Sequence, residues 1–193
     1  MFSGIVEGTG RVNKISQKKD IISIEISPPK GFNKNLKKGA SVSVDGVCLT
    51  SLDKGLRGLK FDIVEETLSR TNFEEINKGS LVNLERSIKY STEIGGHLMS
   101  GHIHFTGKIR KIINKINTKD IIVSFPKKFN GYVFETIGKV NKDSFYIHLI
   151  PETLSVTNLD SLEEGSSVNV EIDQNTISVV ETVKRALAAQ KSR

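Results

Sequence analysis

The sequence has little cysteine, no long apolar run and few aromatic side chains. Its one cysteine, Cys48, excludes an intrachain disulfide framework and a CxxC metal knuckle, and it favours a reducing compartment. No apolar run approaches the roughly 20 residues that a membrane-spanning helix needs, and Met1 leads into FSGIVE rather than into a basic and then apolar leader. We therefore expect a cytoplasmic protein without a membrane segment.

The charge of the chain does not point to nucleic acid. The 193 residues carry a formal charge of +6, but the 28 Lys and Arg are interleaved with 22 acidic residues. The nine Phe and three Tyr form no cluster on which bases could stack. A solvated, lysine-rich surface accounts for the charge, and we expect no nucleic-acid partner.

The chain contains an internal duplication. Residues 66–85 (ETLSRTNFEEINKGSLVNLE) align without a gap with residues 152–171 (ETLSVTNLDSLEEGSSVNVE), and 11 of these 20 positions are identical. Their separation of 86 residues is too long for a solenoid repeat and suits a duplicated small domain. A weaker match pairs residues 4–15 with residues 101–112, which lie 97 residues apart.

The unequal separations point to a hairpin that only the first half contains. Residues 41–50 (SVSVDGVCLT) alternate polar and apolar on either side of an Asp45-Gly46 turn, the pattern of a β-hairpin. The second half has no counterpart of DGVCLT near residues 135–136. Two explanations stay open: the hairpin has been lost, or the natural chain is slightly longer than this one. The motifs retained from Ile147 onward favour the longer chain.

Each half is predicted to consist of short strands separated by turn residues. Five to six strands in about 90 residues favour a small closed barrel, because closure removes exposed sheet edges. We expect an all-β protein with two tandem six-stranded barrels, one in residues 1–94 and one in residues 95–173. Besides the hairpin, the predicted strands are residues 61–64, 80–85, 145–150 and 167–172.

Residues 174–193 are predicted to form a C-terminal α-helix. Val180, Val183 and Leu187 recur at helical spacing, and Asp173 stands where a carboxylate can cap the free amides. The apolar stripe is too narrow for a core helix. Two roles stay open: docking on the protein's own surface, or a short three-stranded bundle with other copies.

Five segments occur in order along the duplicated chain: MFSGIV at 1–6, DGVCLT at 45–50, ETLSRT at 66–71, GGHLMSGHI at 95–103 and HLIPETL at 148–154. Together they resemble the riboflavin synthase family of lumazine-binding proteins. Each is modest alone, but five in order across a duplicated chain are specific. The resemblance implies Greek-key topology for the six-stranded barrels and a C-terminal helix through which three chains associate.

The same resemblance implies a reaction between two identical molecules. Two molecules of 6,7-dimethyl-8-ribityllumazine would become riboflavin and 5-amino-6-ribitylamino-pyrimidinedione by transfer of a four-carbon unit, without a metal or an organic cofactor. Each barrel would bind one ligand, and the N-terminal barrel of one chain would face the C-terminal barrel of a neighbour. The implied partners are the substrate, two further copies of the chain and lumazine synthase. The alternative is a noncatalytic lumazine- or flavin-binding relative.

Joining two ring systems requires orientation, removal of a proton, and hydrogen-bond donors for the resulting anion. A thiol or hydroxyl can add to the ring, and histidine can transfer a proton near neutral pH. The catalytic candidates implied by the resemblance are Cys48, His102, Ser41 and Asp173. The substrate-binding candidates are Gly4, Ile5, Val6, Val47, Cys48, Leu49, Thr50, Asp62, Ile63, Val64, Glu65, Glu66, Thr67, Gly101, His102, Ile103, His148, Leu149, Ile150, Pro151, Glu152 and Thr153.

Each candidate also has a structural explanation. A lone Cys48 at alternate spacing is more often a small packing residue, and Asp173 can serve only as a helix cap. Glu66 and Glu152 recur at the same place in both halves, which fits a duplicated structural hydrogen bond. The histidines at 102 and 104 have no thiolate pair or acidic partner at ligand spacing, so we expect no metal site.

Overall fold

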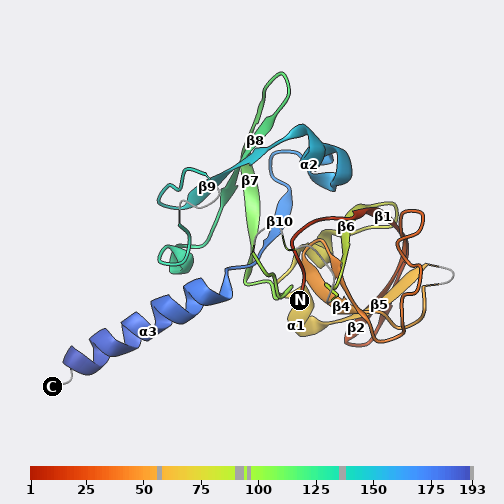
Figure 1. The fold of residues 1–193 in the computed structure, drawn as a ribbon, viewed down its shortest axis with the longest axis horizontal. Helices are drawn as coiled ribbons and strands as arrows, with labels where there is room; N and C mark the ends of the chain where they lie inside the picture. Colours follow the sequence, from red (N-terminus) through yellow and green to blue (C-terminus); the bar gives the residue numbers. More distant parts are fainter. Residues whose placement is uncertain (56–57, 90–93, 95–96, 135–137, 192–193) are drawn as a thin grey trace.

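The computed structural model describes residues 1–55, 58–89, 94, 97–134 and 138–191. The chain forms two β units, each with its own apolar core, and a C-terminal helix α3 (Gln174–Lys191) that projects away from them (Figure 1). Within the described residues, none of the helices has the length and apolar character needed to cross a membrane.

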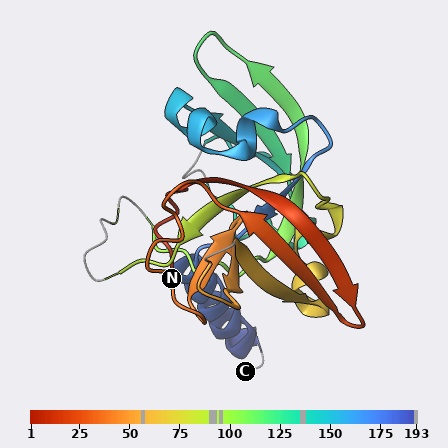
Figure 2. The same cartoon turned by 90° about the vertical axis from the view of Figure 1, so that its right-hand side faces the viewer.

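The first unit is a six-stranded antiparallel barrel. Its strands lie in the order β4-β3-β6-β1-β2-β5, and the Leu52 N–H donates to the Lys60 carbonyl at 2.9 Å, which joins the two outer strands. Figure 2 shows these strands curving around one core. The six-stranded barrel predicted for this half is confirmed, and the four strands predicted by position correspond to β3, β4, β5 and β6. The six strands are β1 (Gly8–Lys18), β2 (Ile21–Ser27), β3 (Ser41–Val44), β4 (Val47–Thr50), β5 (Leu59–Val64) and β6 (Leu81–Arg86).

Short helical segments follow β5 in the first unit. Helix α1 (Glu65–Leu68) leads into the 3₁₀ turn η1 (Asn72–Glu75), and the Thr71 hydroxyl accepts from the Phe73 N–H at the start of that turn. A hydroxyl in this position satisfies an amide that the turn leaves without a partner. Alternation along β5 buries Leu59, Phe61 and Ile63, so the opposite face of the strand is left for other contacts.

The second unit repeats four of the six strands. The order β10-β7-β8-β9 matches β6-β1-β2-β5 of the first unit. The described residues thus contain two strands fewer than a complete six-stranded barrel, because no counterpart of β3 and β4 is present; the predicted gap near residues 135–136 lies outside the described residues. The elements are β7 (Phe105–Asn114), β8 (Lys119–Ser124), η2 (Lys127–Phe129), β9 (Ser144–Leu149), α2 (Pro151–Val156), η3 (Asn158–Ser161) and β10 (Ser167–Val170).

The duplication extends to local irregularities. A register shift interrupts β1 between Val12 and Lys14, and another interrupts β7 between Ile109 and Lys111. These positions are 97 residues apart, as in the sequence alignment. A β-bulge is a specific local feature that increases the bend and twist of a strand. Its recurrence therefore shows that the two units share backbone detail as well as topology.

Helix α3 is attached to the second unit by its first turns. Asp173 caps it, since the Thr176 N–H donates to Asp173 Oδ1 at 2.8 Å. The Tyr132 hydroxyl donates to Glu181, and Lys184 Nζ donates to the Tyr132 oxygen at 2.7 Å. Farther along, Val183 and Leu187 of the predicted apolar stripe are exposed, at 51% and 54%, whereas Val180 is half-buried. Val179, which was not part of the predicted stripe, is 63% exposed.

Candidate functional site

A buried carboxylate holds the N-terminal segment in place. Glu85, on β6, accepts hydrogen bonds through Oε1 from the Ser3 N–H at 2.7 Å, the Ser3 hydroxyl at 2.8 Å and the Gly4 N–H at 3.0 Å. Gly4 has a φ of +76°, in the left-handed region that favours glycine. This carboxylate clamp therefore fixes the direction in which the candidate residues Ile5 and Val6 leave the turn.

The second unit contains the same clamp. Glu171 accepts from the Ser100 N–H at 2.8 Å and the Ser100 hydroxyl at 2.6 Å through Oε1, and from the Gly101 N–H at 2.8 Å through Oε2. Gly101 has a φ of +81°. The residues of the two clamps are separated by the same distances along the chain as the two repeat alignments: 86 residues between the glutamates, and 97 between the serines and between the glycines. Each one presents a glycine-led segment near the junction of the two units.

Gly101 brings the second clamp against the Cys48 hairpin. The Cys48 N–H donates to the Gly101 carbonyl at 2.9 Å. A Cβ atom at position 101 would lie 2.5 Å from Cys48 Cβ, so only glycine fits this approach. His102 follows directly and is exposed, with its N–H donating to the Ser100 hydroxyl at 3.1 Å. The structure thus brings the candidates Cys48, Gly101 and His102 together within one chain.

The hairpin divides its residues between two faces. Ser41 pairs with Thr50, and Ser43 with Cys48, across β3 and β4. Val47 and Leu49 are buried in the barrel core, whereas Cys48 is half-buried and Thr50 exposed. Cys48 and Thr50 therefore point away from the core, as the alternation predicts. Five candidates have side chains buried in a core: Val47, Leu49, Ile63, Ile103 and Leu149. Of these, Ile103 also lines a cavity, whereas the other four offer a ligand only their backbone.

The stretch from Asp62 to Thr67 follows the same alternation. Asp62 is exposed and accepts from the Ser23 hydroxyl at 2.6 Å, and Val64 and Glu65 are exposed as well. Thr67 is half-buried, and its carbonyl accepts from the Thr71 hydroxyl at 2.8 Å. This stretch presents three exposed carboxylates, those of Asp62, Glu65 and Glu66, and a run of backbone groups at the end of β5.

Glu66 and Glu152, which match in the repeat, each accept the same backbone hydrogen bond. The Ser69 hydroxyl donates to the Glu66 carbonyl at 3.0 Å, and the Ser155 hydroxyl donates to the Glu152 carbonyl at 2.8 Å. Both side chains are exposed, and that of Glu66 forms an ion pair with Arg70 at 2.5 Å. The duplicated structural hydrogen bond that the sequence suggested therefore exists. It uses the backbone carbonyls of the two glutamates and not their carboxylates.

His148 is held by a carboxylate of the neighbouring strand. Its Nδ1 lies 2.8 Å from Asp120 Oδ1, and Lys115 Nζ lies 2.6 Å from Asp120 Oδ2. The hydrogen bonds from Lys115 and then His148 lower the pKa of Asp120. The remaining candidates of this stretch surround the start of α2. They are Ile150, which is exposed, Pro151 in the first helical turn, and Thr153, whose carbonyl accepts from the Thr157 hydroxyl.

His104 has a structural role. Its Nδ1 accepts from the Ile172 N–H at 3.1 Å, which requires that this nitrogen carry no proton. Burial lowers the pKa of His104, consistent with a neutral imidazole. His102, two residues earlier, is exposed.

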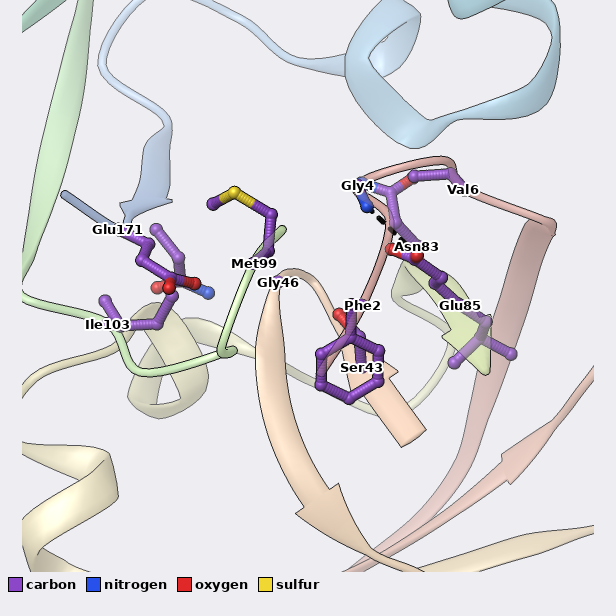
Figure 3. Close-up of a pocket in the computed structure, with 12 residues that line it drawn as sticks. Phe2, Gly4, Val6, Ser43, Gly46, Asn83, Glu85, Met99, Ile103 and Glu171 are labelled. Carbon is purple, nitrogen blue, oxygen red and sulfur yellow. Dashed lines mark hydrogen bonds between the residues drawn. The ribbon is translucent and has the colours of Figure 1, made fainter. Parts of the chain in front are cut away.

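A cavity of about 180 Å³ lies between the two units (Figure 3). Among the candidates, Gly4, Val6 and Ile103 line it. Glu85 and Glu171 lie on opposite sides of it in Figure 3, so the cavity is bounded by the two clamps. Cys48 and His102 are not among its lining residues.

A second cavity, of about 300 Å³, lies in the second unit beside Asp173. Val170 and Ile172 line it. By the repeat alignment they correspond to Leu84 and Arg86, which pair with β3 in the first unit. The cavity therefore occupies the place where a β3 counterpart would pack. Asp173 combines this position with its role as the cap of α3, so the structure shows the capping role and leaves the catalytic one as a prediction.

Four asparagines at the junction were missed by the sequence reasoning. Asn83 and Asn158 form hydrogen bonds across the junction, and Asn169 and Asn72 form the equivalent ones. The signal was present, because Asn72 matches Asn158 and Asn83 matches Asn169 among the identical positions of the repeat.

Comparison with known proteins places the chain in a family. The lumazine binding domain family matches residues 3–87 and 100–173, one match in each half. The riboflavin synthase of Escherichia coli (strain K12) is 38% identical over 204 aligned positions, covering 100% of this chain and 96% of the relative. That of Chlamydia pneumoniae is 39% identical over 200 positions, covering 98% of each. An alignment of 204 positions with a chain of 193 residues leaves at least 11 positions empty in this chain, the size of the missing hairpin.

Solved structures give the same result. LumP complexed with 6,7-dimethyl-8-(1′-D-ribityl) lumazine is similar with a TM-score of 0.80 and 28% identity, covering 89% of this chain and 99% of that one. LumP complexed with riboflavin is similar with a TM-score of 0.78 and 29% identity over the same shares. Two matched domains, and relatives at 38% and 39% identity over nearly their whole length, show that this chain belongs to the riboflavin synthase family of lumazine-binding proteins.

Proposed function

We propose that this protein is a riboflavin synthase, a transferase that converts two molecules of 6,7-dimethyl-8-ribityllumazine into riboflavin and 5-amino-6-ribitylamino-pyrimidinedione. The observation that carries the proposal is the pair of matched carboxylate clamps on Ser3-Gly4 and Ser100-Gly101. A reaction between two identical molecules needs two similar recognition surfaces. Holding both rings in reacting geometry can supply about 7–11 kcal/mol of the barrier.

Three of the four proposed catalytic residues lie on or beside the β3–β4 hairpin. Cys48 and Ser41 offer a thiol and a hydroxyl that add to the ring or hydrogen-bond it, and Cys48 lies beside Gly101. His102 is exposed next to them and transfers the proton that leaves the reacting methyl group. Asp173 acts near the second ring, beside the cavity that it lines.

Substrate contacts come from both units. In the first unit the polar face of β4 and the backbone of residues 62–67 bind one ring, and residues 101–103 complete that pocket. In the second unit residues 148–153 and residues 4–6 bind the other. The segments 101–103 and 4–6 are related by the repeat, so each pocket combines elements of both halves of the sequence.

The proposed assembly is a homotrimer formed through α3. Val183 and Leu187 of the predicted stripe, together with the neighbouring Val179, form a stripe that is more than half exposed, which suits a short three-stranded bundle. In such a trimer the first unit of one chain faces the second unit of a neighbour, where two substrate molecules meet. We place the trimer in the cytoplasm, with lumazine synthase as a partner that supplies its substrate.

A direct assay tests the activity. The purified protein is incubated with 6,7-dimethyl-8-ribityllumazine, and riboflavin fluorescence is followed together with substrate absorbance. Repeated turnover is expected, with two substrate molecules consumed for each riboflavin formed. Cys48→Ala is expected to lose most of the turnover, whereas Ser178→Ala, on the exposed surface of α3, is expected to retain it.

A noncatalytic lumazine- or flavin-binding protein is the second candidate. It is favoured by the four-stranded second unit, since the described residues of that unit have no hairpin to match the one that bears Ser41 and Cys48. The same assay separates the two functions. Stoichiometric binding of the lumazine without riboflavin formation would contradict the enzyme and support the binding protein.

A further inference from the structure

Asp45 occupies the tip of the β3–β4 hairpin, at the junction of the two units. Asp45 and Gly46 have φ values of +45° and +84°, the pattern of a two-residue type I′ turn. The turn points the Asp45 carboxyl toward β6 and the second unit. Its Oδ1 accepts from the Asn83 N–H at 2.7 Å and from Asn158 Nδ2 at 3.1 Å. Its carbonyl accepts from Asn169 Nδ2 at 2.9 Å.

In the part of the chain that the structure describes, this contact exists on one side of the junction only. The asparagine pairs are matched by the repeat, but the counterpart of Asp45 would lie in the hairpin that the second half does not have. Asp45 therefore connects the single catalytic hairpin to two elements of the second unit, η3 through Asn158 and β10 through Asn169.

The hairpin is attached to the second half of the chain at two points. At its tip, Asp45 binds Asn158 of the second unit. On β4, the Cys48 N–H donates to the Gly101 carbonyl. Cys48 follows Asp45 by three residues along the chain, and its own N–H makes the second attachment, to Gly101. A shift of the tip would therefore move Cys48 relative to Gly101 and to His102, which follows it.

We propose that Asp45 is a positioning residue, which sets the place of Cys48 against His102 by holding the hairpin tip on the second unit. The proposal rests on the proposed function in that the kinetic effect requires Cys48 to act in turnover. The attachment of the hairpin does not depend on turnover, and it can be measured separately.

The charge of Asp45 gives the proposal a pH signature. Burial raises the pKa of Asp45 to about 7, and hydrogen bonds from Asn83 and Asn158 oppose the rise. All of its hydrogen-bond partners are neutral amides, so an ionised carboxylate gains no cation there. The raised pKa means that the folded state favours the protonated carboxyl, so the attachment of the hairpin is strongest at low pH, weakens progressively as the pH rises from about 4 to about 7, and changes little above that. The titratable side chains on the elements packed against it, Glu85, Arg86 and Asp160, have partners of their own.

The experiment compares Asp45→Asn and Asp45→Ala with the native trimeric protein. Asn keeps an oxygen acceptor for both donors but carries no charge at any pH, whereas Ala removes the acceptor. Asp160→Asn is the control, because it makes the same change of acid to amide on η3 but at an exposed side chain. Three quantities are measured from about pH 5.5 to about pH 8.5, which spans the pKa. They are kcat and KM for the lumazine, and the rate at which a disulfide reagent labels Cys48, the chain's only cysteine.

For Asp45→Ala we expect kcat to fall about tenfold or more at nearly unchanged KM, and Cys48 labelling to rise, because two donors lose their acceptor. Asp45→Asn should match the native kcat at about pH 6, and the ratios of its kcat and of its labelling rate to the native values should change as the pH rises through about 7, because only the native hairpin carries a titrating carboxyl at position 45. Asp160→Asn should follow the native profile.

Native-like kcat and labelling in Asp45→Ala would overturn the proposal, as would identical pH profiles for Asp45→Asn and the native protein. If Asp45→Ala fails to fold, the comparison of the pH profiles of Asp45→Asn and the native protein still tests the proposal. A native protein without turnover would contradict the proposed function, while the labelling profiles would still test the attachment of the hairpin.

Discussion

Asn83 and Asn158 exchange two hydrogen bonds across the junction of the units: Asn83 Nδ2 donates to Asn158 Oδ1 at 2.7 Å, and the Asn158 N–H donates to Asn83 Oδ1 at 2.7 Å. Their repeat counterparts, Asn169 and Asn72, form the same two bonds, at 2.9 Å each. The two units therefore meet through a local twofold relationship, in which each donates its β-strand asparagine to the 3₁₀ turn of the other.

Asn158→Ala should weaken the junction. Asn158 also donates through Nδ2 to the Leu81 carbonyl at 2.9 Å, so the substitution leaves several polar groups without a partner. The expected loss in the free energy of unfolding is about 1–3 kcal/mol, measured by urea denaturation. Asn13→Ala, at an exposed position within the first unit, is the control and should cost less. Equal losses would contradict the junction's contribution.

Gly101→Ala should destabilise the protein through a steric clash with Cys48. The matched control is Gly79→Ala, because Gly79 has a similar φ of +97° but no atom within 4 Å of an added Cβ. In both variants an alanine must adopt a left-handed backbone conformation, which lowers the free energy of unfolding by roughly 1–3 kcal/mol. Only Gly101→Ala adds the clash, about 1–3 kcal/mol more. Denaturation and the labelling rate of Cys48 measure the difference, and equal effects at both glycines would refute it.

Acid should weaken the second unit through Asp120. Its pKa is lowered in the folded protein, so its contribution to stability is present above the unfolded-state pKa and is lost as the pH falls below about 4. Asp120→Asn should therefore be less stable than the native protein at neutral pH and should lose less on acidification. The free energy of unfolding against pH gives the result, with the exposed Asp20→Asn as control. An unchanged acid slope in Asp120→Asn would exclude this contribution.

Removal of the tail from Thr176 onward should give monomers, because the exposed stripe on α3 is lost. Val183→Asp should have the same effect with the chain intact, since a charge in the seam of a bundle is unfavourable. Thr182→Asp, one position away on the same helix, should leave the trimer intact. Sedimentation measures the mass, and an unchanged mass in Val183→Asp would rule out assembly through this stripe.

Riboflavin should bind to one tight site per chain. Within the described residues, a hairpin of the kind that bears Ser41, Cys48 and Thr50 occurs only in the first unit, whereas the corresponding place in the second unit is a cavity. Calorimetric titration of the native protein with riboflavin measures the stoichiometry, with Cys48→Trp as a variant that blocks the hairpin face. Two equivalent sites per chain would show that the second unit binds without a hairpin.

The sequence by itself determined the duplication, the hairpin at Asp45-Gly46, and the face on which Cys48 lies. These features depend on local periodicity and on residues within one element, which a pattern can reveal. It also indicated the missing hairpin, because two copies of one repeat can be compared with each other. The helix cap at Asp173 follows from the same kind of local rule.

Tertiary structure decided which of these residues meet. The contact of Asp45 with Asn169 joins positions 124 residues apart, and the clamp of Glu85 on Ser3 joins positions 82 apart. Neither follows from a local pattern, since each depends on how two separately formed cores pack against each other. The place of Cys48 beside Gly101 has the same origin: each segment is recognisable in the sequence, but only the packing of the two units brings them within hydrogen-bonding distance.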